Sequence, residues 1–293
     1  MNAPDRPSFI LLGVLVVLAL FFIWRWLDKE RPGILDVLTG FVTNFFDTLG
    51  IGSFATTTAI FKFRHRMPDE QIPGTLNIGH ALPTVVQALI YISIIQVQFA
   101  TLVSMIGAAV LGAWLGAGVV SRLPRRAIQI GMGVALLVAA MLFAMRNLDV
   151  KPGPGEAHAL SGGLLLVGVG VNFVLGALMT LGIGLYAPCL ILVSMLGMNP
   201  DAAFPIMMGS CAFLMPPAGL RFIARGRYNL KASLGLALGG ALAVPLAASL
   251  VFKLPITHLR WLVIFVVVFA AVMMLRSAVL ESRRASAQVP EQV

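Results

Sequence analysis

The sequence contains very little charge. Only 11% of its 293 residues are Asp, Glu, Lys or Arg, whereas about a quarter are charged in a typical soluble domain. Hydrophobic residues make up 59% and the mean hydropathy is +0.94. Many apolar runs exceed the ~18 residues that mark a membrane-spanning helix, and the alternating strands of a membrane barrel are lacking. These features exclude a soluble protein and predict an integral membrane protein built of helices.

Residues that build catalytic or metal centres are also scarce. The two cysteines, Cys189 and Cys211, lie in apolar segments without metal-ligand spacing. Three of the four histidines fall in loops or at span ends, which leaves His80 alone. No Gly-x-x-x-x-Gly-Lys-Ser/Thr sequence for ATP is present. We therefore expect no metal, no cofactor and no enzyme activity.

The net charge of +9 arises from 21 basic residues against 12 acidic ones. The basic residues form short clusters between apolar runs, a pattern that reports membrane topology rather than binding to nucleic acid. The expected partners are the lipid bilayer and a small anionic substrate, and no oligomeric state is predicted.

A five-residue sequence occurs twice in the chain. Residues 48–52 read Thr-Leu-Gly-Ile-Gly, and residues 180–184 repeat them inside another long apolar run. The same offset of 132 aligns Pro68 with Pro200 and Asp69 with Asp201. The chain is therefore predicted to hold two copies of one unit, each with a helix break at membrane depth.

The segments that contain these breaks are too long for a simple crossing. Residues 34–63 would make one helix of ~45 Å against a hydrocarbon core of ~30 Å. They form either an interrupted single span or a re-entrant hairpin. With single spans, the basic residues divide almost evenly between the two sides. With hairpins, sixteen of the 21 fall on one side, as expected of a cytoplasmic face.

The hairpin alternative defines the predicted fold. It is an all-α polytopic membrane protein of two inverted repeats, each a re-entrant, broken helical hairpin plus three transmembrane helices, with one extra N-terminal helix. The parts are an N-terminal helix and basic loop (1–33), repeat 1 (34–150), repeat 2 (151–284) and a C-terminal tail (285–293). In this topology the N-terminus is expected outside and the C-terminus in the cytoplasm.

The returning half-helices define the predicted substrate site. Each would direct the free N–H groups and the positive end of its dipole into the protein, so that two such ends make an anion site. The glycines have the alternative role of close helix packing. The candidate substrate-binding residues are Gly50, Gly52, Ser53, Thr56, Thr57, Asn77, His80, Gly182, Gly184, Tyr186 and Ser210.

Two ionisable side chains in the first repeat are candidates for proton coupling. Asp47 is the deepest acidic residue and either carries a coupling proton or caps the half-helix after the break; its counterpart in the second repeat is Met179. His80 shares a helix face with Asn77 and Gln87, and is either a satisfied core histidine or a contact for substrate or proton. Proline at position 83, and at 216 and 217, is expected to kink the two helices at this level.

The motifs of both halves, over residues 34–280, resemble the TauE/SafE sulfite exporter family. The resemblance rests on the basic loop, the glycine-rich break in each long segment, the Gly-Ile-Gly at 182–184 followed by Pro188, and the proline-bearing third segment. It implies a transporter of sulfite, of a sulfonate such as sulfoacetate, or of a related small organic anion, located in a bacterial inner membrane and without a cofactor. The first repeat departs from the family pattern by having Thr56 where the second has Pro188, and by carrying Asp47.

The predicted function is a secondary transporter that exports a small sulfur-containing oxyanion by alternating access at the site between the two half-helix N-termini. A passive anion channel, or a permease for another small organic anion, is the alternative.

Overall fold

The structure is a computed structural model, described here for residues 6–26, 31–120, 125–148, 155–179, 184–253 and 256–287. Within these ranges every regular element is a helix, apart from one isolated bridge between Ala157 and Met198. The helices are α1 (Arg6–Trp26), α2 (Ile34–Thr48), α3 (Ser53–Phe63), α4 (Ile72–Gly79), α5 (Ala81–Ile94), α6 (Phe99–Val120), α7 (Arg125–Asn147), α8 (Gly162–Met179), α9 (Tyr186–Met195), α10 (Ala203–Ala224), α11 (Leu230–Val251) and α12 (Ile256–Ala287), with 3-10 turns at Asp69–Gln71 and Pro200–Ala202.

The lengths and compositions of these helices are those of a multi-pass membrane protein. In the described ranges, four helical segments are long and apolar enough to cross a bilayer: Ile72–Ile94, Gly162–Met179, Pro200–Ala224 and Leu230–Val251. Shorter apolar stretches lie in α1, α6, α7, α9 and α12. The all-helical, polytopic class predicted from the sequence is confirmed.

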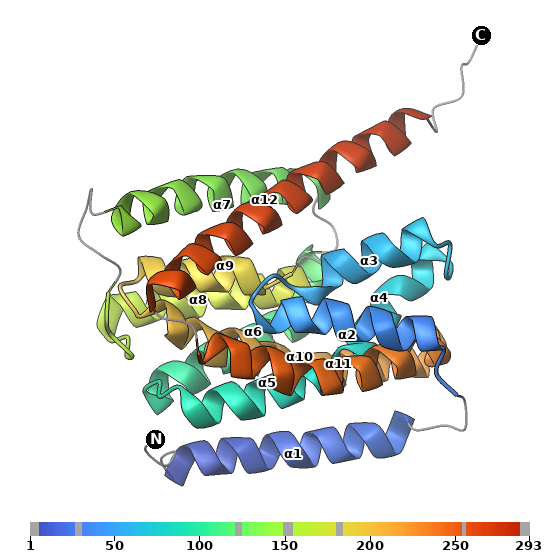
Figure 1. Cartoon of the computed structure of the whole chain (residues 1–293), viewed down its shortest axis with the longest axis horizontal. Helices are drawn as coiled ribbons and strands as arrows, with labels where there is room; N and C mark the ends of the chain where they lie inside the picture. Colours follow the sequence, from blue (N-terminus) through green and yellow to red (C-terminus); the bar gives the residue numbers. More distant parts are fainter. Residues whose placement is uncertain are drawn as a thin grey trace.

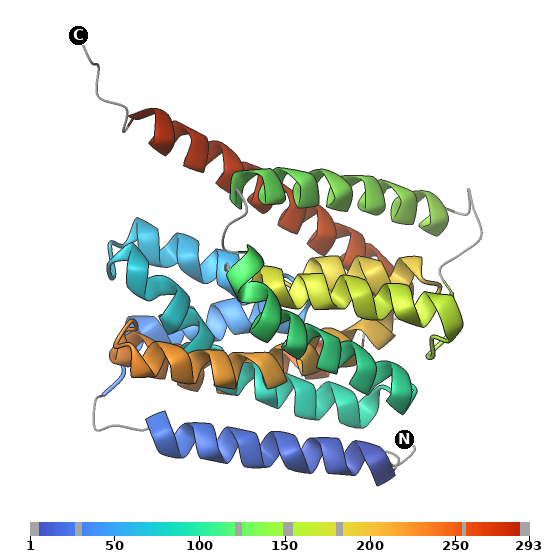
Figure 2. The same cartoon turned by 180° about the vertical axis from the view of Figure 1, so that it is seen from behind.

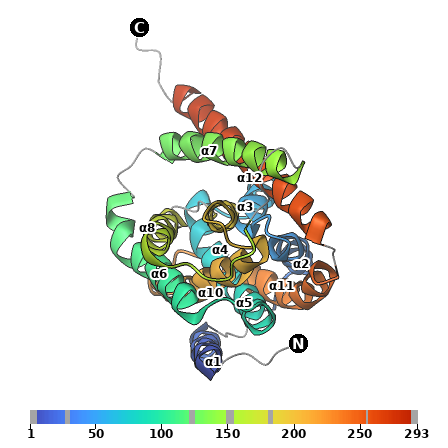
Figure 3. The same ribbon diagram turned by 90° about the vertical axis from the view of Figure 1, so that its left-hand side faces the viewer.

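The helices form a central bundle with one layer on each side. In Figure 1, α7 and α12 lie together above the bundle and α1 lies below it. The view from behind shows the same three layers (Figure 2), and the end view shows α2 to α6 and α8 to α11 grouped between them (Figure 3). Gln129 of α7 donates to Ser277 of α12 (3.2 Å), which joins the two outer helices. The helices that hold the candidate site residues belong to this central bundle.

The first broken segment folds back on itself. α2 ends at Thr48, a glycine-containing turn follows, and α3 begins at Ser53. Arg66, just beyond α3, makes a bidentate ion pair with Asp36 in the first turn of α2 (3.0 and 2.6 Å). The beginning of α2 and the end of α3 therefore lie at the same end of the bundle, and the two helices form a hairpin.

The second broken segment closes in the same way. Before α8, the carbonyl of Ala157 accepts the N–H of Asn199, which follows α9 (2.9 Å). The backbones of Gly155 and Gly197 are also in direct contact. Both ends of the α8–α9 unit therefore meet; residues 180–183, which link the two helices in the sequence, lie outside the described ranges.

The two hairpins are anchored at opposite ends of the bundle. The chain leaves the Arg66 end through α4 and α5, and the loop that follows α5 contacts the base of the second hairpin, where Gln98 N–H donates to the carbonyl of His158 (2.9 Å). Figure 1 shows the same arrangement, with α2 and α3 reaching inward from one end and α8 and α9 from the other. The two tips therefore meet near the middle.

The interruption between α4 and α5 falls at His80. Pro83 has no N–H to donate to the carbonyl of Gly79, four residues earlier, so the helical ladder is interrupted one turn before the proline. α10, by contrast, runs unbroken through Pro216 and Pro217. The last helix, α12, extends to Ala287, into the segment that the sequence analysis assigned to the C-terminal tail.

Glycine allows α11 to lie directly against α2. A Cβ at Gly239 would strike the carbonyl oxygen of Val37, and one at Gly40 would lie 2.6 Å from the Leu236 backbone. Such close approach of backbones through small residues is the usual way in which membrane helices associate. Packing by glycine is therefore real between α2 and α11, whereas a Cβ added at Gly52 or Gly184 beside the breaks would meet no neighbour within 4 Å.

Candidate functional site

A small cavity lies where the two hairpin tips meet. Residues 52–54 at the N-terminus of α3 line one side, and residues 184–186 at the N-terminus of α9 line another. Thr84, Met179, Cys211 and Met215 close the remaining sides. The space open to the centre of a water molecule is about 20 Å³, which is room for about one water. An oxyanion with four or more heavy atoms does not fit the cavity in this conformation.

The turn before α3 is capped by Asp47. Gly50 and Gly52 have φ of +98° and +88°, in the region that only glycine adopts readily. This backbone path brings the N–H of Ser53 onto Asp47 Oδ1 (2.5 Å), and the carboxylate is buried. Asp47 thus satisfies a helix N-terminal donor from six residues upstream, which corresponds to the capping role left open by the sequence.

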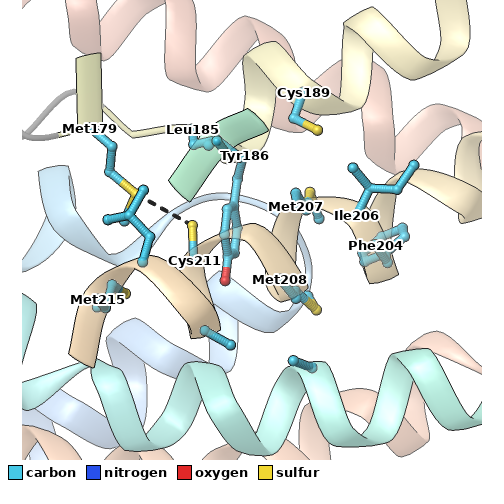
Figure 4. Close-up of a cluster of buried hydrophobic side chains, with 14 of the residues drawn as sticks. Met179, Leu185, Tyr186, Cys189, Phe204, Ile206, Met207, Met208, Cys211 and Met215 are labelled. Carbon is cyan, nitrogen blue, oxygen red and sulfur yellow. Dashed lines mark hydrogen bonds between the residues drawn. The ribbon is translucent and has the colours of Figure 1, made fainter. Parts of the chain in front are cut away.

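Gln87 of α5 connects Asp47 to the second hairpin. Its Nε2 donates to Asp47 Oδ2 (2.9 Å) and to Thr48 Oγ1 (3.0 Å). Its Oε1 accepts the hydroxyl proton of Tyr186, the first residue of α9 (2.8 Å). Figure 4 shows the Tyr186 hydroxyl directed toward α5. The tips of both hairpins are therefore joined through one fully buried amide side chain.

His80 belongs to a neighbouring polar cluster. Asn44 Nδ2 donates to the carbonyl of Gly40 (2.8 Å), so Asn44 Oδ1 is the acceptor that faces His80 Nδ1 (3.1 Å). The imidazole therefore carries its proton on Nδ1, and Nε2 accepts the hydroxyl proton of Thr57 on α3 (3.0 Å). Both ring nitrogens are satisfied, and the ring connects α2, α3 and the α4–α5 interruption.

The second hairpin tip offers softer and more apolar groups. Met179, at the position equivalent to Asp47, accepts a weak hydrogen bond from Cys211 Sγ (3.4 Å), which Figure 4 shows. The residue before α9 is Leu185, whose side chain has no acceptor to cap the helix. Pro188 in the first turn removes one N–H that would otherwise need a partner. Only the first hairpin therefore places a carboxylate at the cavity.

The candidate residues divide between this centre and other places. Ser53, Gly52, Gly184, Tyr186 and Asp47 all line the cavity. Thr57 and His80 form the adjacent cluster, Gly50 shapes the turn, and Thr56 donates to the carbonyl of Ser53 within α3 (2.9 Å).

Three candidates lie elsewhere or outside the described ranges. Ser210 accepts from Asn172 Nδ2 (3.2 Å) and does not line the cavity. Asn77 lines a different groove, although the sequence placed it on one face with His80. Gly182 lies outside the described residues.

Thr84, Cys211 and Met215 line the cavity but were not among the site residues predicted from the sequence. Their side chains carry no distinctive motif, and only the packing of α5 and α10 against the tips places them at the cavity. Among the described residues, no group of three or more His, Cys, Asp or Glu side chains is arranged to hold a metal ion.

Taken together, the fold and this centre define a multi-pass helical membrane protein with a polar site between two opposed helix N-termini. The family model of the sulfite exporter TauE/SafE matches residues 3–143, in the first half of the chain, and supports the family predicted from the sequence. The match indicates a membrane transporter of anions such as sulfite. The matched range includes α1, whereas the resemblance seen in the sequence began at residue 34. No curated protein and no solved structure gives a significant match.

Replacing Asp47 by alanine is expected to destabilise the protein. The N–H of Ser53 and the amide of Gln87 would both lose their acceptor in a site with little water, at a cost of about 1–3 kcal/mol for each unpaired group. Asp47→Asn keeps an acceptor for Ser53 and should lose less. Thermal unfolding in detergent would measure both changes, with the exposed Glu156→Ala as the control. An Asp47→Ala protein as stable as wild type would contradict the capping role.

Proposed function

We propose that the protein is a secondary transporter that exports a small sulfur-containing oxyanion, such as sulfite or a sulfonate, and is not an enzyme. The observation that carries the proposal is a single cavity bounded by the N-termini of both α3 and α9. Helix N-termini attract anions through their free N–H groups and their positive dipole ends. The family match over residues 3–143 supports the same class of substrate.

In this proposal the two hairpins are re-entrant segments of inverted repeats. Their bases lie at opposite ends of the bundle, which supports insertion from opposite faces of the membrane. The basic segments 62–66 and 221–231 lie at one end, because Arg66 pairs with Asp36 and the Arg227 backbone contacts Gly74. Under the positive-inside rule this end faces the cytoplasm. The N-terminus is then outside and the C-terminus inside, in a bacterial inner membrane.

The site recognises its substrate by backbone and neutral groups. Among the described residues no Lys or Arg lines the cavity, so an anion would be held by the N–H groups of the two helix ends and by a hydroxyl such as that of Ser53, because Thr84 donates its proton to the carbonyl of His80 (2.8 Å). This donor set suits a small anion with one or two charges. With the inside negative, export of one negative charge is favoured by ~2.3 kcal/mol per 100 mV, so no ATP is required.

Asp47 controls the first of the two helix ends. As a carboxylate it occupies the N-terminus of α3 and repels a second anion. Protonation removes that charge and turns one oxygen into a donor that faces Gln87 Nε2. The Gln87 amide must then turn over, which alters its bond to Tyr186. Proton binding at Asp47 would therefore both admit the anion and loosen the link between the hairpin tips.

Alternating access requires this link to break and re-form. A cavity of about 20 Å³, too small for the anion, supports a transporter that changes conformation to bind its substrate. A passive anion channel needs a continuous path, and a permease for another small organic anion would share the same site. Saturable flux of labelled sulfite into proteoliposomes distinguishes the transporter from the channel, and competition by sulfonates and carboxylates defines the substrate.

Filling the second hairpin tip should abolish transport. Gly184 lines the cavity, and a Cβ added there would have no neighbour within 4 Å. Gly184→Leu therefore places its side chain in the site without a backbone clash. Sulfite flux in proteoliposomes is expected to fall to background. Gly170→Leu on the exposed face of α8 is the matched control, since its Cβ also meets open space. Wild-type flux in Gly184→Leu would overturn the site between the helix ends.

Asp47→Asn should remove the pH dependence of transport. With equal pH on both sides, wild-type flux is expected to rise as pH falls, because the protonated carboxyl no longer competes with the anion. The asparagine imitates the neutral form, so its flux should be nearly constant across the same range. Glu156→Gln, an exposed carboxylate at the far end, should keep the wild-type profile. An unchanged profile in Asp47→Asn would remove Asp47 from the coupling.

The orientation of the hairpins can be tested by cysteine labelling in cells. Arg64 and Glu156 are both exposed and lie at opposite ends of the bundle, while the native Cys189 and Cys211 are buried. A membrane-impermeant maleimide should label Glu156→Cys in intact cells and Arg64→Cys only after permeabilisation. Labelling of Arg64→Cys in intact cells would contradict the proposed topology.

A further inference from the structure

A large groove opens beside α6, away from the central cavity. Its lining comes from α4, α6 and α10, and the space open to the centre of a water molecule is about 520 Å³. It lies at the end of the bundle where α10 ends and α4 begins, because Asn229 N–H, just after α10, donates to Thr75 Oγ1 of α4 (2.9 Å). This is also the end that carries the basic segments 62–66 and 221–231.

The groove exists because α6 is longer than the helix beside it. α6 and α8 start together, where Leu160 N–H donates to Thr101 Oγ1 (3.0 Å), and they run parallel until a Cβ on Gly176 would contact the carbonyl of Ala109. α8 ends at Met179, three residues further, whereas α6 continues to Val120. The last turns of α6 therefore have no α8 beside them, and the groove lies between those turns and α10.

The wall of the groove is apolar. α6 contributes Val110, Ala113 and Trp114, and α10 contributes Leu214 and Pro217. Trp114 is 63% exposed. A surface of this kind in a membrane protein faces acyl chains, and tryptophan is enriched near the level of the headgroups.

Two cations stand at one end of this apolar wall. Arg221 and Arg225 are one helical turn apart at the end of α10, both line the groove, and both are exposed. Within the described residues neither has an ion pair, and no Asp or Glu lines the groove. Asn77 is the one other polar side chain of the lining. A hydrated small anion would therefore find few donors along the groove. An amphiphile with an anionic head would match both the two arginines and the apolar wall.

We propose that this groove binds one anionic phospholipid, such as phosphatidylglycerol, from the leaflet on the basic side. Arg221 and Arg225 hold the phosphate, and an acyl chain lies along Trp114 and Leu214. Basic pockets between helices on the cytoplasmic side are known to select acidic headgroups, with about 1 kcal/mol for each basic residue, or about a fivefold effect on binding. The proposal does not depend on the transported substrate.

Trp114 supplies the reporter for the test. With Trp24, Trp26 and Trp261 changed to Phe, the protein is reconstituted into phosphatidylcholine vesicles that contain brominated phosphatidylglycerol or brominated phosphatidylcholine at the same mole fraction. Bromine quenches tryptophan fluorescence on contact. Quenching should be stronger with the brominated phosphatidylglycerol, and unlabelled phosphatidylglycerol should relieve it.

The arginine variants give the decisive comparison. Arg221→Gln and Arg225→Gln should each lower the binding constant for phosphatidylglycerol relative to phosphatidylcholine about fivefold. Arg227→Gln, exposed in the same loop but outside the groove, should leave it unchanged. Thermal unfolding of each variant confirms that it is folded.

Equal quenching by the two brominated lipids, or unchanged selectivity in both groove variants, would overturn the proposal. If free sulfite relieved the quenching, or if the groove variants lost sulfite flux while keeping wild-type lipid selectivity, the groove would instead be a path for the substrate. Either result leaves the site between the helix ends to be judged by the Gly184→Leu experiment alone.

Discussion

The central constraint on this protein is that backbone N–H groups at a helix break must find acceptors where water is scarce. At the first break the protein meets this requirement with one side chain, because Asp47 accepts the N–H of Ser53. The rest of the centre is arranged around that carboxylate. Gly50 and Gly52 bend the chain so that the N–H of Ser53 reaches the carboxylate. Gln87 donates to the second carboxylate oxygen and accepts the hydroxyl proton of Tyr186.

The two hairpin tips meet the same constraint in different ways, and this difference gives the proposed transport its chemistry. Where the first tip has Asp47, the second has Met179, with Cys211 beside it and Pro188 in the helix that follows. The internal carboxylate stands at the place where one oxygen of a bound anion would lie in a symmetric site. Under the proposed mechanism, a proton on Asp47 converts this occupied end into a second binding end, so that proton binding favours binding of the substrate.

The buried centre and the basic end of the bundle differ in charge. Among the described residues, the cavity at the centre is lined by no Lys or Arg, and an uncompensated cation at membrane depth is costly. The basic segments 62–66 and 221–231 instead lie at one end of the bundle, and two of their residues, Arg221 and Arg225, border an apolar groove. Under the two proposals, neutral donors at the centre bind the transported anion, and the arginines at the surface bind the anionic lipid.

The sequence alone determined the helical membrane class, the positions of both breaks and the start of α3 at Ser53, because these depend on local properties: apolar length, glycine and proline. It also identified Asp47 and His80 as buried polar residues, but it left their roles open. Only the tertiary structure decided that Asp47 caps α3, that Gln87 reaches Tyr186 across the two halves, and that Asn77 lines a groove apart from His80. Helical spacing predicts which side chains share a face, but the interruption at His80 changes that face, and the partners come from helices about 40 to 100 residues away in the chain.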